Sequence, residues 1–220
     1  MNFNIIIPSA RAENLVPCVQ AVMQCEPELD PRRIIVIDDG ARANCNIQGL
    51  TWITGIKPFV YSRNCNLGIL LAAGEGIVLL NDDALIQTPG GFTAMAEASQ
   101  GWGLLGPTTN CSGNPNQLKR YNDGLVRLEP NRCIPFLCVY IPRKTIEHVG
   151  LLDERFTGYG FEDMDYCRRT REAGLRLGIF DGCFIDHLSL KSTYRGNPGT
   201  PADLSPGRKI YERKWGAGAD

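Results

Sequence analysis

Three short apolar runs, rich in β-branched residues, place the strongest constraint on how this chain can fold. They occupy residues 3–7 (FNIII), 34–37 (IIVI) and 77–80 (IVLL). Continuous apolar runs of this length are typical of strands covered on both faces. The segments between them, 13–25 and 66–73, carry apolar residues at helical spacing. This alternation predicts an α/β domain with a mostly parallel central sheet flanked by helices.

The C-terminal half predicts the rest of one domain and a tail. Residues 108–133 lose the apolar periodicity and gain Asn, Gly and Pro, which indicates a long irregular excursion. Periodicity then returns, with a helix expected from Glu162 to Gly174. We expect one domain over residues 1–195 and a mobile tail over 196–220 with a short basic helix, either a solvated surface helix or part of a lid.

Charge and cysteine content exclude several function classes. Lys plus Arg number 23 against 24 Asp plus Glu, so the net charge of −1 provides no general attraction to nucleic acid or anionic membranes. Nine cysteines without a Cys-x-x-Cys pair indicate reduced, mostly buried thiols. No apolar stretch is long enough to span a bilayer and no basic leader precedes the first run, so we expect a cytoplasmic protein without a transmembrane segment.

Polar residues follow each of the three apolar runs. The runs lead into PSAR (8–11), DDG (38–40) and NDDA (81–84). Taken singly, each acidic pair is also explained by turn formation or helix capping. The carboxyl ends of parallel strands share one edge of the sheet, where carboxylates repel one another unless a cation or a donor-rich ligand lies between them. A divalent metal carrying a nucleoside diphosphate would supply both, whereas G-x-G-x-x-G and P-loop motifs are absent.

A second acidic group begins the helix expected from residue 162. Glu162, Asp163 and Asp165 fall in its first turn, where acids complement the helix dipole. Asp165 is explained by pairing with Arg168 or Arg169 at three- or four-residue spacing. Because residues two apart lie on roughly opposite faces of a helix, Asp163 must point away from Asp165 and is free to face a cleft.

Several motifs in order resemble one enzyme family. The segments IIVIDDGA, LLNDDALI and VGLLDERFTGYGFEDMDYCRR, with the late Asp186 and His187, together resemble the family-2 inverting glycosyltransferases, in particular the rhamnosyltransferase-like branch. The resemblance runs from Asn4 to about Trp215. It implies a single Rossmann-like GT-A domain and a metal-dependent transfer of a hexosyl or deoxyhexosyl group from a nucleoside-diphosphate sugar to an acceptor hydroxyl, with inversion.

The resemblance also implies roles for individual residues. It assigns donor binding to Pro8, Arg11, Asp39, Arg63, Asn81 and Asp82. Asp39 would read the nucleotide base, and Asn81 replaces the usual first aspartate of the family's D-x-D element, which leaves one fewer charge for a metal. Asp83 and His187 would bind Mn²⁺ or Mg²⁺, the nitrogen ligand favouring Mn²⁺. As a lone histidine, His187 has a hydrogen-bonded structural role as the alternative.

The resemblance assigns catalysis to the family's E-D motif. Here that motif is Glu162 and Asp163, with Asp163 as the base. The donor implied is a UDP- or dTDP-sugar, and the acceptor is a saccharide, a lipid-linked intermediate, a protein or a modified nucleic acid. Two other functions stay open, a noncatalytic nucleotide-sugar binding protein and a nucleotidylyltransferase, although the G-x-G-x-R loop of the latter is absent.

Overall fold

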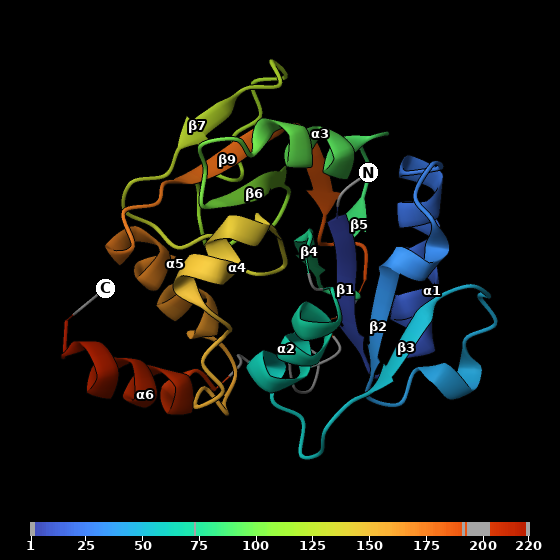
Figure 1. The fold of residues 1–220 in the computed structure, drawn as a ribbon, viewed down its shortest axis with the longest axis horizontal. Coiled ribbons are helices and arrows are strands. Elements are labelled where there is room, and N and C mark those ends of the chain that lie inside the picture. Colours follow the sequence, from blue (N-terminus) through green and yellow to red (C-terminus); the bar gives the residue numbers. More distant parts are fainter. Residues whose placement is uncertain (1–2, 73, 191, 193–202, 219–220) are drawn as a thin grey trace.

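One mixed sheet with helices on both faces forms the centre of the protein in the computed structural model, which describes residues 3–72, 74–190, 192 and 203–218 (Figure 1). The strands are β1 (Phe3–Ser9), β2 (Ile34–Asp38), β3 (Thr51–Thr54), β4 (Gly76–Leu80), β5 (Leu85–Ile86), β6 (Leu104–Thr109), β7 (Val126–Leu128), β8 (Cys138–Ile141) and β9 (Leu177–Asp186). The helices are α1 (Ala12–Cys25), α2 (Tyr61–Leu71), α3 (Gly91–Ala98), α4 (Arg143–Val149), α5 (Glu162–Glu172) and α6 (Ser205–Trp215), with 3-10 turns η1 (Pro31–Arg33) and η2 (Arg42–Asn44).

The sheet has a parallel N-terminal half and a mixed C-terminal half. Its order is β3-β2-β1-β4-β8-β6-β9-β5, and β7 pairs with β9 outside this path. The predicted α/β class and the parallel strands β1, β2 and β4 are confirmed. Strand β8 enters antiparallel between β4 and β6, and β9 pairs parallel with β6 but antiparallel with β5 and β7. The carboxyl ends of β1, β2 and β4 therefore meet at one edge.

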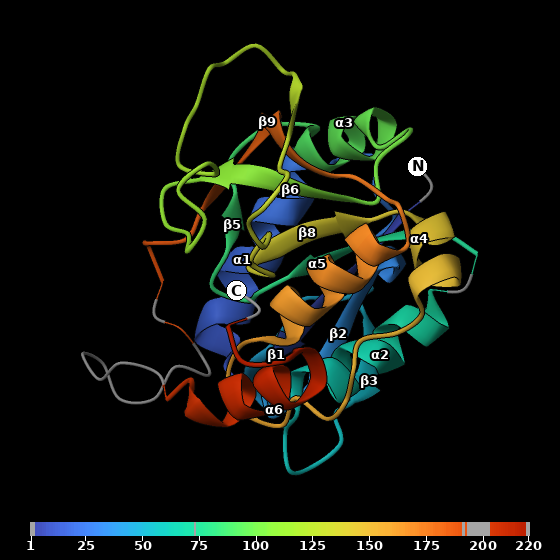
Figure 2. The ribbon, with the colours of Figure 1, turned by 90° about the vertical axis from the view of Figure 1, so that its left-hand side faces the viewer.

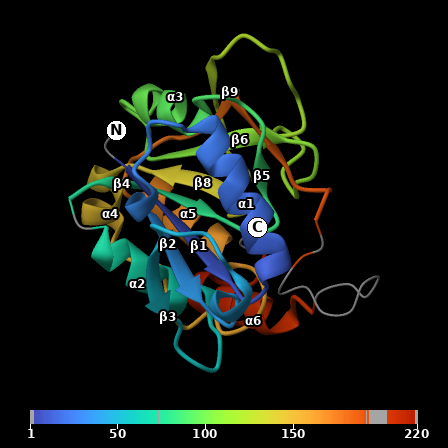
Figure 3. The same ribbon diagram turned by 90° about the vertical axis from the view of Figure 1, so that its right-hand side faces the viewer.

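The sheet separates two apolar cores. Strand β1 serves both because successive side chains point to opposite faces: Ile5 and Ile7 pack on the α1 and α3 side, and Ile6 packs on the side of α2, α4 and α5. All three are fully buried. Helix α1 lies across the first face, as Figure 3 shows. Double coverage explains why the strand runs are continuously apolar rather than alternating.

The excursion predicted over residues 108–133 is partly wrong. Strand β6 continues to Thr109, and residues 126–128 form the edge strand β7. The remaining segment between β6 and β7, yellow-green in Figure 2, projects from the body of the domain. A strand of three residues is too short to show a period, and β7 is defined by its pairing with β9 rather than by its own sequence.

The C-terminal helix is present and docked. Residues 196–202 of the predicted tail lie outside the described residues, as do 219 and 220, whereas α6 is described throughout. The Tyr211 side chain of α6 is buried, and the ammonium of Lys214 contacts the carboxylates of Asp153 and Asp165. This face of α6 is therefore not a solvated surface.

Among the described residues, no helix is both long and apolar enough to cross a membrane. Six of the nine cysteines are buried, all nine as free thiols.

Candidate functional site

A cavity of about 510 Å³ lies at the carboxyl ends of β1 and β4 and at the start of α5. Seven of the predicted site residues line it: Pro8, Asn81, Asp82, Asp83, Glu162, Asp163 and His187. They come from four separate parts of the chain, so the tertiary fold brings together what the sequence presents as isolated motifs. This is the position at which open α/β sheets bind ligands.

The turn after β4 holds its acids in defined positions. The β1 and β4 strands are parallel neighbours, which places the end of β1 beside this turn. The Ser9 hydroxyl donates a 2.6 Å hydrogen bond to the Asp82 carboxylate, and both side chains are buried. The backbone N–H of Asn81 donates a hydrogen bond to the Leu137 carbonyl across the β4–β8 pair. These bonds fix the turn so that the carboxylate of Asp83, 5% exposed, faces the cavity.

Asp83 and His187 form a pair suited to a divalent cation. Nε2 of His187 lies 3.4 Å from Oδ1 of Asp83, and Nδ1 of His187 lies 3.3 Å from the carbonyl oxygen of Cys111. A neutral imidazole that donates its Nδ1 proton to this carbonyl presents the Nε2 lone pair to the carboxylate. Two lone pairs at this separation repel unless a proton or a metal lies between them, so the pair fits a cation.

Other metal ligands would have to come from elsewhere. Among the described residues, no group of three or more His, Cys, Asp or Glu side chains is placed to hold a metal. A Mg²⁺ or Mn²⁺ ion prefers about six ligands, so most of its coordination positions would be left to water and to phosphate oxygens. The pair therefore fits a cation that arrives with a phosphorylated ligand.

Glu162 and Asp163 lie half-buried at the start of α5 and line the same cavity. Burial raises the pKa of both carboxyls, and the charge of Asp163 raises the pKa of Glu162 further. The Met164 amide donates a 2.8 Å hydrogen bond to Oδ1 of Asp163, and a hydrogen bond from the Cys133 thiol also favours the ionised form. Oε2 of Glu162 is a buried atom without a hydrogen-bond partner in the described part of the chain. Hydrogen bonds thus favour the ionised form of Asp163, whereas burial and the neighbouring charge favour the protonated form of Glu162.

Asp165 points away from the cavity, as its spacing from Asp163 predicts. Its carboxylate is 0% exposed and accepts hydrogen bonds from Nε of Arg169 at 2.9 Å and from Nε1 of Trp215 at 2.9 Å. Arg168 pairs with Glu172 instead. The adjacent acids therefore divide into a pair that faces the cavity and one buried structural carboxylate.

Three predicted donor residues do not line this cavity. Asp39 follows β2, its side chain is 7% exposed, and its carboxylate pairs with the ammonium of Lys57, which also donates to the Asp39 carbonyl at 3.0 Å. Arg11 is exposed at the start of α1. The Arg63 guanidinium donates to the Pro58 carbonyl, and its Nε is buried.

Sequence reasoning missed much of the cavity wall. The additional lining residues are Phe59, Tyr61, Cys111, Ser112, Gly113, Pro135, Phe136, Leu137, Thr157, Gly158, Tyr159, Gly160 and Ser192. Residues 111–113 belong to the excursion predicted over residues 108–133, and glycines 158 and 160 precede the E-D motif. Lys57 also escaped prediction, because a lone lysine in a loop carries no signal for its partner.

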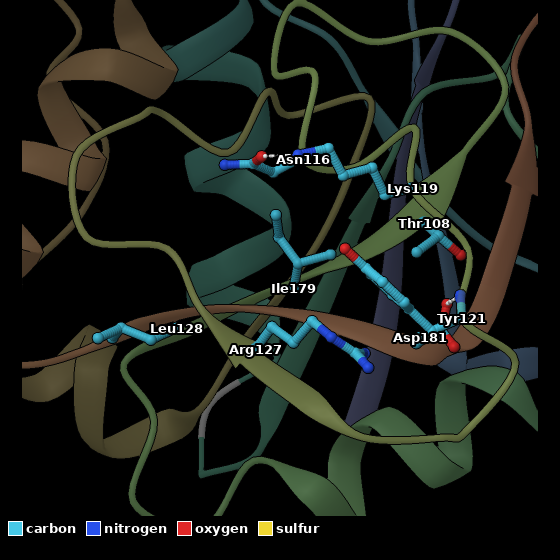
Figure 4. A pocket seen from close by; sticks show the side chains of 8 residues that line it. All are labelled: Thr108, Asn116, Lys119, Tyr121, Arg127, Leu128, Ile179 and Asp181. Carbon is cyan, nitrogen blue, oxygen red and sulfur yellow. Dashed lines mark hydrogen bonds between the residues drawn. The ribbon is translucent and has the colours of Figure 1, made fainter.

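A second cavity of about 190 Å³ lies between β7, β9 and the projecting segment, and Figure 4 shows its lining. The Asp181 carboxylate accepts hydrogen bonds from the amides of Tyr121 and Asp123, and so anchors the segment to β9. The Arg127 guanidinium stacks on the Tyr121 ring, 3.8 Å from its centroid. None of the predicted site residues lines this cavity. The Asp181 carboxylate and the Arg127 guanidinium there hold the projecting segment in place, which gives both groups a structural role.

Comparison with known proteins places the fold. No protein-family profile and no curated protein matches the sequence. Among solved structures, GalNAc-T7 in complex with UDP, GalNAc and Mn²⁺ aligns with a TM-score of 0.73 at 12% identity, over 98% of this chain and 48% of that one. The mannosyltransferase PcManGT from Pyrobaculum calidifontis, in complex with GDP-Man and Mn²⁺, gives 0.62 at 15% identity over 88% and 59%. TarS from S. aureus gives 0.56 at 12% identity over 84% and 60%.

The chain thus spans about half the length of the GalNAc-T7 chain and about three fifths of the other two. At these identities the likeness concerns the backbone arrangement, and assignment to family 2 or to its rhamnosyltransferase-like branch stays a prediction. The likeness confirms the fold expected from the motifs: the chain has the GT-A glycosyltransferase fold.

Proposed function

We propose that the protein is a metal-dependent inverting glycosyltransferase that moves a sugar from a nucleoside-diphosphate sugar to an acceptor hydroxyl. The observation that carries this proposal is the convergence of two pairs on one cavity, Asp83 with His187 and Glu162 with Asp163. One pair suits a cation and the other suits proton transfer. They come from different elements, so a sugar held between them would have its leaving group at one pair and its acceptor at the other.

Asp163 acts as the general base in this proposal. Its carboxylate, stabilised in the ionised form by hydrogen bonds from the Met164 amide and the Cys133 thiol, takes the proton from the acceptor hydroxyl as that oxygen attacks the anomeric carbon. A single in-line displacement inverts the configuration. Glu162 keeps its proton and can donate a hydrogen bond from its carboxyl group, whose Oε2 is a buried, unpartnered atom in the described chain, to the incoming acceptor.

Asp83 and His187 would hold the divalent ion, with Asn81 in its coordination shell or on the donor ribose. When bound, such an ion neutralises the charge that develops on the departing nucleoside diphosphate. Carboxylate ligation suits Mg²⁺ or Mn²⁺, and the imidazole nitrogen favours Mn²⁺. Mn²⁺ is also present in the GalNAc-T7 and PcManGT structures, which supports this choice.

The donor is proposed to extend from the cavity toward the end of β2. Pro8 lines the cavity, and Asp39 follows the neighbouring strand as the candidate reader of the base. The ammonium of Lys57 forms an ion pair with the Asp39 carboxylate. Binding of a nucleotide base there would have to displace the ammonium or use it as an additional hydrogen-bond donor. UDP and GDP-Man in the similar structures support a nucleotide donor, and UDP- or dTDP-sugars are the first to test.

The test is a panel of nucleotide sugars in the presence of Mn²⁺, with thermal stabilisation and donor hydrolysis as readouts. The active donor should raise Tm in wild type and in Asp163→Asn, but only wild type should turn it over. Asp83→Ala should lose the Tm rise. With an acceptor in hand, proton NMR of the product should show an inverted anomeric configuration. A donor that binds without turnover in wild type would favour a noncatalytic nucleotide-sugar binding protein, and retained configuration would refute the single displacement.

A further inference from the structure

The backbone directly before Glu162 is held in an unfavourable conformation. Phe161, the N-terminal capping residue of α5, has a φ of 75°. Among the described residues, only Phe161 and Asn122 are non-glycine residues with positive φ. Bulky side chains rarely occupy this left-handed region, and such residues persist only where the surrounding structure imposes them. The conformation at Phe161 sets the direction in which α5 starts, and therefore where Glu162 and Asp163 point.

Helix α6 provides the apolar support for this residue. Phe156, Phe161 and Tyr211 form a buried cluster separate from the two main cores. The rings of Phe161 and Tyr211 lie 5.6 Å apart between centroids, at an interplanar angle of 49°, and the Arg208 guanidinium lies 5.5 Å from the Phe161 ring. Besides Phe156 and Met164 of α5, the side chains of this cluster come from α6: Tyr211, Ile210 and Trp215.

The start of α6 also packs closely against the backbone of the cavity wall. A Cβ built on Gly207 would lie 2.5 Å from the Gly160 carbonyl oxygen, and one built on Gly158 would lie 2.8 Å from Cβ of Pro206. At such short distances a side chain at position 207 or 158 would force the neighbouring atoms to shift. Residues 158–160 line the cavity, so α6 lies directly behind that wall.

The other end of α6 is fixed to the body of α5. The ammonium of Lys214 lies 2.6 Å from Oδ1 of Asp165, and Nε1 of Trp215 donates a hydrogen bond to the same atom at 2.9 Å. Figures 1 and 2 both show α6 beside α5 and the segment that leads into it. Helix α6 therefore spans from the cavity wall to the first turns of α5.

We infer that helix α6 is a clamp that positions Glu162 and Asp163 for the transfer reaction, with Tyr211 as the positioning residue that keeps Phe161 in its left-handed conformation. The inference rests on the proposed function. Without the Tyr211 ring, Phe161 relaxes to negative φ and the first turn of α5 turns its carboxylates out of the cavity. Pro8 lies in β1, and the cation pair lies in the segments that follow β4 and β9, so donor binding stays intact.

The first experiment compares Tyr211→Ala, Tyr211→Phe and Lys209→Ala. Lys209 is an exposed residue of the same helix and is the matched control. We expect Tyr211→Ala to lower kcat by about tenfold or more, the scale of loss that follows from misplacing a catalytic group by a fraction of an ångström to one ångström. The Tm rise produced by UDP and Mn²⁺ should be unchanged. Tyr211→Phe keeps the aromatic ring and should have the kcat of wild type. Lys209→Ala should also have the kcat of wild type.

A second variant and a second readout keep the test independent of folding and of the reaction. Gly207→Ala retains the apolar cluster but presses on the Gly160 carbonyl, and should lower kcat at unchanged far-UV circular dichroism. Amide hydrogen exchange over residues 156–166 should speed up in Tyr211→Ala and stay at the wild-type rate in Lys209→Ala.

Unchanged exchange, or a kcat in Tyr211→Ala equal to that of the control, would overturn the clamp. A loss of donor binding in proportion to kcat would also overturn it, because the effect would then be general unfolding. Wild-type protein inactive with every donor would refute the proposed function, and the exchange rates would still decide whether α6 holds this backbone.

Discussion

Replacing Lys214 by methionine should destabilise the protein because it removes a cation from a buried carboxylate. Asp165 is 0% exposed and is held by Lys214 at 2.6 Å, by Arg169 at 2.9 Å and by Trp215 at 2.9 Å. A hydrogen bond to a charged group contributes about 1.5–3 kcal/mol, and stripping a buried ion of a partner costs about 3–5 kcal/mol. Because two partners remain, we expect a loss near the lower end, about 2 kcal/mol.

Thermal and urea unfolding at neutral pH measure this loss. A change of about 2 kcal/mol in a chain of this size corresponds to a fall in Tm of about 4–8 °C. Lys209→Met, on the exposed face of the same helix, is the control and should leave Tm unchanged. In an Asp165→Asn background Lys214→Met should cost less, because the charge it compensates is gone. Equal effects of the two lysine substitutions, or full additivity with Asp165→Asn, would refute the reasoning.

Four further outcomes are expected. Asp83→Ala should abolish both transfer and the Tm rise caused by Mn²⁺ with UDP, and activity that persists in excess chelator would contradict the metal site. Asp163→Asn should lower kcat about 10²-fold or more with little change in donor affinity. Since burial raises the pKa of both Asp163 and Glu162, the folded state holds protons at this pair that the unfolded state releases, so the contribution of the pair to stability should fall as pH rises above the ordinary carboxyl range. Urea titrations without divalent ions should show this contribution reduced in Asp163→Asn relative to wild type. Glu26→Ala should cost about 1–3 kcal/mol in urea unfolding, because this buried carboxylate accepts from the Phe92 and Thr93 amides at the start of α3; a smaller loss than that of a surface Glu→Ala control would exclude the cap.

Local sequence patterns were sufficient for the framework of this protein. Continuous apolar runs predicted β1, β2 and β4, and helical spacing predicted α1 and part of α2. Helices were also expected where α5 and the basic helix α6 lie. The opposite orientations of Asp163 and Asp165 also followed from helix geometry alone. These features are predictable because they depend on the period of one segment and on which of its faces is apolar.

Other features depended on contacts between distant segments. Strand β7 exists through its pairing with β9, and the antiparallel position of β8 between β4 and β6 has no local signature. The pairing of Asp39 with Lys57 and the buried role of Lys214 were equally invisible, since a charged residue in sequence looks solvated until a partner is placed beside it.

The candidate site shows the same division. The motifs marked Asp83, Asp163 and His187 as strand-end or helix-start residues, but only the folded sheet places the His187 imidazole 3.4 Å from Asp83 and encloses both with Asp163 in one cavity. The left-handed Phe161 behind them was not expected from its sequence, because a bulky residue adopts that conformation only where tertiary packing, here Tyr211 of α6, outweighs its local preference.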